Sequence, residues 1–546
     1  MGGDTMPKRF CFFFLAAMAA VLLTLSAWSA QSTGKPGVPT FQTSDRCVAC
    51  HNGLATRAGE DISIGLAWKP TMMANAARDP YWHAAVRRES IDHPESRAAI
   101  EDECSICHMP MARFESKLGG HEGTVFSRLG FLPDDRGDQL AVDGVSCSLC
   151  HQIGKEKLGS RESFVGSFVI GGPNVQGQRM EFGPYAPDAG HARIMRSSTG
   201  GFLPVESAHI RQSEVCATCH TLITQALGPG GKTIVEFPEQ VPYQEWLHSE
   251  YREKRSCQSC HMPAVEEEVA ISSVLGVPRK EVSRHLFLGG NFFMNGILNR
   301  YRNELSVHAL PDELTGNARR TKEHLQSEAA RISIEKVEER GGRLEVDVAI
   351  ENFGGHKLPT AYPSRRVWLH LAVWDAGNHS LFESGAMNSN GAIIDNDNDA
   401  DATRFEPHYT EIRNTGQVQI YEAIMADSSG AVTTGLLNSV RYLKDNRLLP
   451  RGFDKKTAEA DIAVAGNALE DLDFRGGADR VRYSIDLGPA QGPFRIEAEL
   501  CYQPIGYRWA MNLKNYNAEE PRQFIGYYEA AAGSSMVVLA HASRKQ

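Results

Sequence analysis

The sequence predicts a mixed fold in two parts: a mainly α-helical and irregular region, followed by an all-β domain of the immunoglobulin-like sandwich kind. Three observations predict this division. The 546 residues exceed what one hydrophobic core usually organises. One cysteine motif occurs five times, always before residue 262. After about residue 325, apolar and polar residues alternate as they do in strands that bury one face.

The N-terminus has the pattern of an export signal. Lys8 and Arg9 precede the apolar stretch 10–27, and small residues follow up to Ala30. A basic start, an apolar centre and a small-residue cleavage site are typical of secretory signals. We therefore expect residues 1–30 to be removed, and the mature protein to be periplasmic or extracellular. The alternative is an uncleaved anchor that associates the protein with a membrane, because the stretch approaches the ~18 residues of a spanning helix.

The charge of the chain argues against a nucleic-acid partner. The formal net charge is -10, and the sequence has no long basic run. Proteins that bind nucleic acid present a basic surface to the phosphates.

Ten of the twelve cysteines form five copies of the pattern C-x-x-C-H. The cysteines are Cys47, Cys50, Cys104, Cys107, Cys147, Cys150, Cys216, Cys219, Cys257 and Cys260, and the histidines that follow are His51, His108, His151, His220 and His261. In this motif the thiols bond covalently to haem and the histidine binds its iron. A zinc site would leave the histidine unexplained, and a thioredoxin-like motif needs a βαβ context. We predict five haem c groups.

The motifs divide the chain into domains. Residues 31–310 are rich in Gly, Pro and short polar segments, which suits a pentahaem domain whose core is supplied by the macrocycles. Residues 311–331 have helical composition and form the predicted linker. Residues 332–546 contain alternating strands such as 344–350 and 481–487, and form the predicted sandwich. An up-and-down barrel is the lesser alternative.

A six-coordinate iron needs one further ligand, and fourteen histidines lie outside the motifs. The favoured candidates are His93, His191, His209, His285 and His356, with His83, His121 and His248 as reserves. His209 precedes Cys216 on what the sequence predicts as one helix, and the small residues after His285 let a flat ring approach the backbone. Met72 or Met73 is the competing kind of ligand, which would raise the potential of one haem.

His356 lies far from the motifs, in the stretch GHKLPTAYP of the predicted β domain. Gly354 and Gly355 permit close approach, and Pro359 stiffens the chain that follows. We predict that this loop carries an imidazole from the β domain into the haem domain. The alternative is a histidine that hydrogen-bonds within its own loop.

The motif surroundings resemble the cytochrome c-554 family over roughly residues 40–300. The resemblance rests on Cys-His-Met-Pro at the second and fifth motifs, on residues 143–147 at the third, and on Glu245-Trp-Leu before the fifth. It implies a periplasmic or extracellular electron carrier with closely stacked, mostly bis-histidine haems. It also implies a C-terminal β domain of the kind that some relatives carry, with a segment similar to residues 356–360.

Three functions fit these features. The first is electron transfer with a redox protein or a quinol-linked donor or acceptor. The second is an oxidoreductase in which one open haem acts on a small nitrogen or sulfur compound. The third is a subunit of an extracellular cytochrome filament, in which copies of the chain associate. Uniform motifs and a surplus of histidines favour the non-catalytic carrier.

Two further features lie in the second half. Residues 395–401 alternate carboxylates as calcium loops do, but Ala400 stands where an EF-hand requires glycine, so a solvated turn is favoured over calcium. Cys501 alternates with the apolar residues of its predicted strand, which places it on the face of Glu497 and Glu499 as a free thiol.

Overall fold

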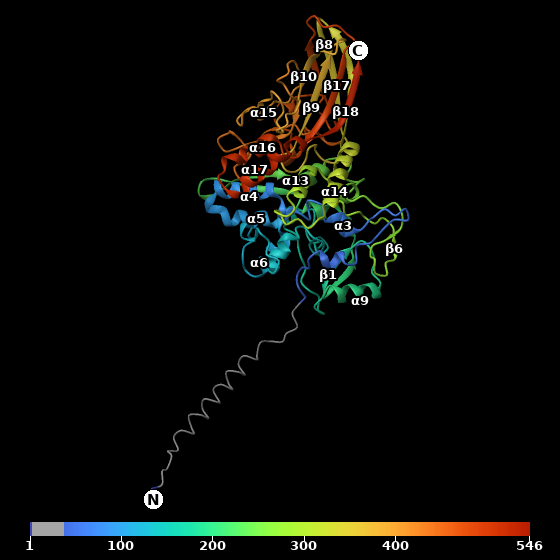
Figure 1. Cartoon of the computed structure of the whole chain (residues 1–546), viewed down its shortest axis with the longest axis vertical. Coiled ribbons are helices and arrows are strands. Elements are labelled where there is room, and N and C mark those ends of the chain that lie inside the picture. Colours follow the sequence, from blue (N-terminus) through green and yellow to red (C-terminus); the bar gives the residue numbers. More distant parts are fainter. Residues whose placement is uncertain (3–37) are drawn as a thin grey trace.

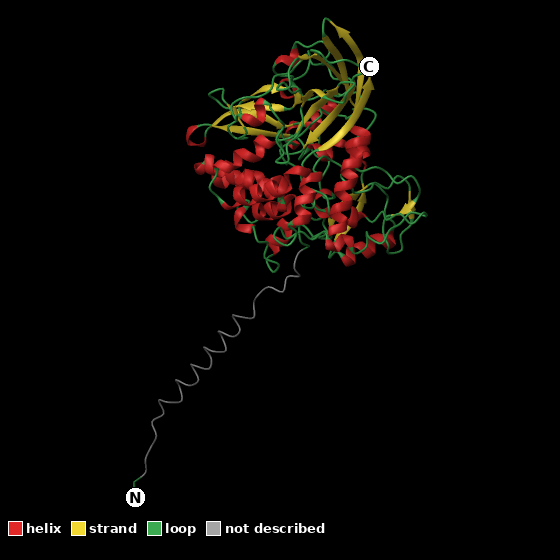
Figure 2. Cartoon of the chain, turned by 45° about the horizontal axis from the view of Figure 1, so that its top comes forward, coloured by secondary structure: helices red, strands yellow, loops and turns green. Residues whose placement is uncertain are grey.

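The computed structural model describes residues 1–2 and 38–546. The predicted export signal and its anchor alternative fall on residues that, beyond Met1 and Gly2, are not described. Between residues 38 and 546, no helix combines the length and the apolar character that a membrane span needs. Helices gather at one end of the described chain and the longer strands at the other (Figures 1 and 2).

The first half consists of short helices joined by loops and three two-stranded sheets. The helices are α2 (Asp45–Val48), α3 (Ile64–Trp68), α4 (Pro80–Asp92), α5 (Arg97–His108), α6 (Pro110–Leu118), α7 (Arg136–Val142), α8 (Cys147–Cys150), α9 (Ala189–Ser198), α10 (Ser213–Ala217), α11 (Pro242–Leu247), α12 (Cys257–His261) and α13 (Phe292–Arg300). The sheets pair β1 (Arg179–Gly183) with β2 (Phe202–Glu206), β3 (Leu222–Leu227) with β4 (Thr233–Gln240), and β5 (Val269–Ala270) with β6 (Pro278–Arg279). Each motif therefore lies on or beside a short helix.

A longer helix leads from the first half to the second. α14 (Pro311–His324) begins where the Glu313 carboxylate accepts the Leu310 N–H at 2.7 Å, and Pro311 stands at its first position. A π-helical turn covers Leu325–Ala329, and the first long strand begins at Ala330. α14 packs along α13, so it belongs to the wall of the helical half as well as to the connection.

The strands of the second half form two main sheets. One has the order β10-β9-β17-β18, with β12 also on β9, and the other has the order β11-β16-β8-β7. Their bounds are β7 (Ala330–Arg340), β8 (Arg343–Asn352), β9 (Arg366–Trp374), β10 (Ser380–Ser384), β11 (Glu411–Ile412), β12 (Ile420–Tyr421), β16 (Ala478–Asp486), β17 (Arg495–Gln503) and β18 (Val537–Lys545). A smaller sheet joins β13 (Ala423–Ala426), β14 (Val432–Thr433) and β15 (Arg441–Asp445).

The two main sheets pack face to face. Along β8, the residues from Leu344 to Ile350 that alternate inward are fully buried, and Val348 lies opposite Val481 of β16. The Phe382 ring of β10 meets the Tyr483 ring of β16, with centroids 6.0 Å apart. The inward side chains of both sheets form one hydrophobic core. This is a sandwich of two sheets, and an immunoglobulin-like topology stays a prediction.

The sequence predicted an all-β second half, and this prediction was wrong. It contains α15 (Asp397–Ala400), α16 (Tyr507–Met511) and α17 (Glu519–Ala531). α17 buries Phe524 and Tyr528, which are spaced one helical turn apart. It lies against α4, where the Phe524 and Tyr81 rings are 4.9 Å apart (Figure 1). α17 therefore returns to the helical half before β18 rejoins the sandwich.

One of two local predictions was wrong. His209 and Cys216 do not share a helix: a 3-10 turn ends at Arg211, and Gln212 is extended before α10 begins. The face of Cys501 was predicted correctly. β17 stays in register with β9, so Leu500 faces the main core and Cys501, paired with Trp368, faces the other side of the sheet, which is also buried. The Cys501 thiol packs in a buried cluster with Trp368 and is not bonded to another cysteine.

Candidate haem-binding cavity

A single cavity of about 1400 Å³ runs through the helical half. Its wall includes both cysteines and the histidine of every C-x-x-C-H motif, from Cys47 to His261. The ten motif cysteines are free thiols, and none forms a disulfide. Five attachment motifs that are spread over more than two hundred residues therefore open into one shared space.

Four of the motif histidines are oriented by a backbone carbonyl. The Nδ1 atom of His51 lies 2.5 Å from the Ile271 oxygen, that of His108 3.0 Å from Ala76, and that of His151 2.6 Å from Phe182. His261 makes the same contact with the Leu288 oxygen. Because a carbonyl only accepts, each Nδ1 carries the proton and Nε2 is left with its lone pair. This is the tautomer that can bind a metal through Nε2.

Burial favours the neutral form of four motif imidazoles, those of His108, His151, His220 and His261. The pKa values of His108 and His261 fall to about 4 mainly because the cavity wall desolvates the charged form. Burial also lowers the pKa values of His151 and His220. At neutral pH the rings are unprotonated at the ligand nitrogen and can bind iron without first losing a proton.

Two motif histidines face a second histidine across the cavity. The ring centroids of His151 and His285 are 6.4 Å apart with planes inclined by 22°. Those of His261 and His356 are 6.2 Å apart and inclined by 14°. Two metal–nitrogen bonds of about 2 Å each, with ring centres about 1 Å further out, give a separation of about 6 Å. Both pairs leave room for one metal ion between the rings.

The second members of these pairs are also oriented for ligation. His285 Nδ1 lies 3.1 Å from the Ser283 oxygen, and His356 Nδ1 lies 2.9 Å from the Lys357 oxygen. Each Nε2 is therefore free of the proton. The short contact of His356 with its own loop was the alternative interpretation of this residue, and here it orients the ring toward His261.

The other three candidate histidines are placed differently. His93 is buried, and its Nε2 has no hydrogen-bond partner, although it is not part of the cavity wall. His191 lies in the wall, but its Nδ1 contacts the Asp188 carboxylate and its Nε2 lies 2.8 Å from the Leu275 oxygen. His209 lies outside the wall, with Nδ1 2.7 Å from the Ser207 hydroxyl and Nε2 2.8 Å from the Ile153 oxygen.

One histidine of the cavity wall escaped sequence reasoning. His324 of α14 faces the cavity together with Asn317 and Thr321. The spacing of these residues follows one face of a helix, a signal that could have been read from the linker. His324 lies near His356, and burial lowers its pKa.

Cysteines of different motifs lie close together. The thiol of Cys147 is near enough to Cys47 to raise the pKa of Cys47, and in the same way Cys107 raises the pKa of Cys219 and Cys257 that of Cys216. Cys150 of the third motif lies near both cysteines of the fourth. The attachment points are thus contiguous: the first motif meets the third, the third meets the fourth, and the fourth meets the second and the fifth.

The loop with His356 is part of both halves. It follows β8 and is pinned to the β domain by paired backbone hydrogen bonds between Leu358 and Leu448, each 2.9 Å. On its other side, Gly355 packs against Trp246 of α11, where an added Cβ would lie 3.3 Å from the indole ring. Only a residue without a side chain fits here without displacing the indole. The loop therefore inserts a histidine between two closely packed domains.

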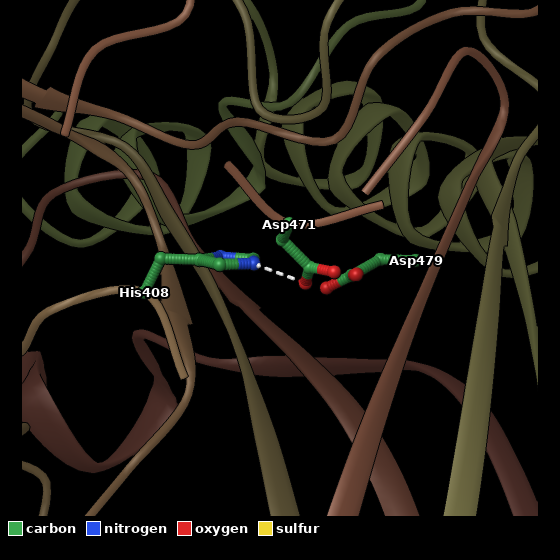
Figure 3. Close-up of side chains that lie close together, drawn as sticks. All are labelled: His408, Asp471 and Asp479. Carbon is green, nitrogen blue, oxygen red and sulfur yellow. Dashed lines mark hydrogen bonds and ion pairs between the residues drawn. The ribbon is translucent and has the colours of Figure 1, made fainter. Parts of the chain in front are cut away.

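One further group of described residues has the spacing of metal ligands: His408, Asp471 and Asp479 (Figure 3). Its hydrogen bonds argue against a metal. The His408 Nδ1 accepts from the side-chain amides of Gln419 and Asn446, at 2.9 and 3.1 Å. The proton therefore lies on Nε2, which donates to Asp471 at 3.0 Å. The ring nitrogen nearest the carboxylates is occupied, and the group is a buried hydrogen-bond network.

The aspartate loop also has protein partners. Asp399 forms a bidentate pair with Arg366 at 2.8 and 2.9 Å, and Asp397 pairs with Arg404 at 2.6 Å. Asp401 accepts the backbone N–H and the hydroxyl of Thr403. Three of the four aspartates therefore have protein partners. The turn is less solvated than predicted, because the Asp399 side chain is 2% exposed.

One comparison with solved structures found a protein with a similar fold. The chain is similar in structure to a penta-heme cytochrome c552 from Thermochromatium tepidum, with a TM-score of 0.51 over 93% of this chain and 99% of that one. The two share a fold. Their sequence identity is 15%, so the likeness extends to the fold alone. No protein-family model and no curated protein matches the chain.

Proposed function

We propose that this chain is an exported c-type cytochrome that transfers electrons through five covalently bound haems. The observation that carries the proposal is the cavity itself, whose wall holds all five motifs and two facing histidine pairs. The Nε2 atom of His93 is buried without a hydrogen-bond partner, so it is available to bind a further iron. Bound haem would supply an iron that gains and loses one electron.

The residues divide into three roles under this proposal. The ten motif cysteines attach the groups, and the five motif histidines are the proximal ligands. His285 and His356 are the opposite ligands of the third and fifth sites, because their ring separations from His151 and His261 match a shared metal. His93 and His191 are the candidates for other irons, and His324 joins them. His209 is the weakest candidate, because both of its nitrogens are bonded and, unlike His191, it lies outside the cavity wall.

The proximity of cysteines from different motifs supports electron transfer between the haem sites. Thioethers attach at the rim of a haem, so cysteines that lie close together would hold two rims near each other. The close cysteine pairs connect the sites in the order first, third and fourth, with the second and the fifth branching from the fourth. A contiguous series suits exchange with an external partner, which we propose to be a redox protein or a quinol-linked donor or acceptor in the periplasm or outside the cell.

The stoichiometry tests the proposal. Mature protein should contain five haems per chain by the pyridine haemochrome assay, and they should stay attached through denaturing electrophoresis because thioethers are covalent. Reductive titration should take up five electrons per chain. Four or fewer haems in fully matured protein would contradict the proposal.

A small-molecule reductase is the second candidate, because one part of the wall suits an anion. Tyr81, Tyr362 and Arg365 line the cavity, and the charge of Arg365 contributes to the lowered pKa of His220. Buried tyrosines can donate protons, and a guanidinium binds oxyanions. Under the carrier proposal, the oxidised protein is low-spin throughout and binds no nitrite. Rapid nitrite binding and turnover at one iron would instead favour the reductase.

A further inference from the structure

The carboxylate of Glu245 is fully buried where α11 meets the loop that carries His356. Its Oε2 accepts the Lys357 backbone N–H at 3.1 Å and the Thr360 hydroxyl at 2.5 Å. Its Oε1 forms an ion pair with Arg447 at 3.0 Å, at an angle outside hydrogen-bond geometry. One side chain of the helical half thus holds three groups of the β domain.

The charged groups around Glu245 balance one another and are buried from solvent. Lys357 donates from Nζ to Asp445 at 2.6 Å, and Arg447 donates to the same carboxylate from Nε and Nη2 at 2.8 and 2.7 Å. All four side chains are buried, with two positive and two negative charges. Removing one charge from such a set leaves another buried without compensation. The network therefore has one favoured arrangement, and the loop is fixed with it.

These contacts hold the backbone next to His356. Lys357 directly follows His356, and Thr360 lies on the far side of Pro359. On the β side, Asn352 donates to the His356 oxygen at 3.0 Å. The backbone of residue 356 is thus held from the β domain, and that of residue 357 from α11. A shift of the loop away from α11 would move the ring away from His261.

We propose that Glu245 is a positioning residue for the iron of the fifth site: it fixes the loop so that His356 stays on the metal. This inference rests on the proposed ligation by His356. Glu245 itself contacts neither ring. It acts through the backbone of Lys357 and the hydroxyl of Thr360. The position of His356 therefore depends on how closely α11 packs against the β domain.

The test uses full-length, haem-loaded protein and carbon monoxide as the probe of an open iron. Glu245→Gln removes the charge but keeps one acceptor, and Thr360→Val removes only the hydroxyl contact. Each should raise the rate of carbon monoxide binding at one iron in five by about tenfold or more, which corresponds to a contact weakened by about 1.4 kcal/mol. Glu253→Gln, an exposed carboxylate in the same segment, is the matched control and should leave the rate unchanged.

A double-variant comparison separates positioning from plain stability. In a His356→Ala background, neither Glu245→Gln nor Thr360→Val should alter carbon monoxide binding further, because the group on which they act is gone. Unchanged rates in both single variants, even with a lower melting temperature, would overturn the positioning role. If His356→Ala alone binds no carbon monoxide, the ligation fails and the inference fails with it.

Discussion

Replacing His356 with alanine should open one iron and leave five haems attached. The attachment of the fifth group depends on Cys257 and Cys260, whereas the imidazole that faces His261 comes only from the β-domain loop. Loss of a strong-field ligand converts a low-spin iron to a high-spin or water-bound one. The oxidised spectrum should show one high-spin centre in five, and the reduced protein should bind one carbon monoxide per chain.

The control for this experiment is His379→Ala. His379 lies in the β domain with its side chain 80% exposed, and it contacts only the Asp375 side chain and backbone of its own turn. Its removal should leave every iron low-spin. A fully low-spin spectrum in His356→Ala would show that the ligand opposite His261 comes from elsewhere, and His324 would be examined next.

The second large effect is expected from Asp445→Asn. Asp445 accepts hydrogen bonds from both Lys357 and Arg447, and all three side chains are nearly inaccessible to solvent. The amide would leave two buried cations, Lys357 and Arg447, with Glu245 as the one remaining carboxylate of the network. Breaking a buried pair in this way costs about 3–5 kcal/mol of the free energy of unfolding. Denaturant unfolding of the haem-loaded protein would measure it.

Glu267→Gln is the matched comparison, because the Arg57–Glu267 pair is 3.5 Å long and Arg57 is 89% exposed. Surface pairs contribute about 0–1 kcal/mol, so this variant should unfold almost as the parent does. Equal stabilities of the two variants would contradict a structural role for the buried network.

The same network predicts an acid-dependent loss of stability. Lys357 and Arg447 hold the pKa of Asp445 well below its ordinary value. A carboxyl group with a lowered pKa in the folded state stabilises the protein above its unfolded pKa of about 4 and loses this contribution as the pH falls further. Asp445→Asn should therefore show a flatter stability profile below about pH 4 than the parent protein.

The sequence predicted the residues of the cavity wall better than the architecture. The fixed spacing of the C-x-x-C-H pattern identifies its cysteines and histidines without further context, and all of them line the cavity. The strand around residues 344–350 was also predicted correctly, because alternating apolar residues identify the buried face of a strand. α17 was missed because a search for strands overlooks a period of 3.6 residues.

Opposite ligands are harder to find because they are set by tertiary contacts. His356 could be singled out, since glycines and prolines mark a loop built for close approach. His209 looked equally suitable, yet its nitrogens are bonded to the neighbouring Ser207 and to the distant Ile153, and no local pattern reveals the second contact. His324 went unnoticed because a histidine on a polar helix resembles a solvent-exposed residue until its neighbours are known.

The insertion of the β-domain loop into the cavity wall has a consequence for biogenesis. The motif around Cys257 precedes residue 356 along the chain, and it carries every group needed to attach its haem. In the folded chain the loop follows β8, which pairs with β16 from residues 478–486. Under the proposed function, we therefore expect covalent loading of the fifth site to need only residues before 262, and its axial closure to need most of the C-terminal half. A partly synthesised or truncated chain would be fully pigmented yet reactive toward small ligands, which makes the colour of such a preparation a poor measure of its maturity.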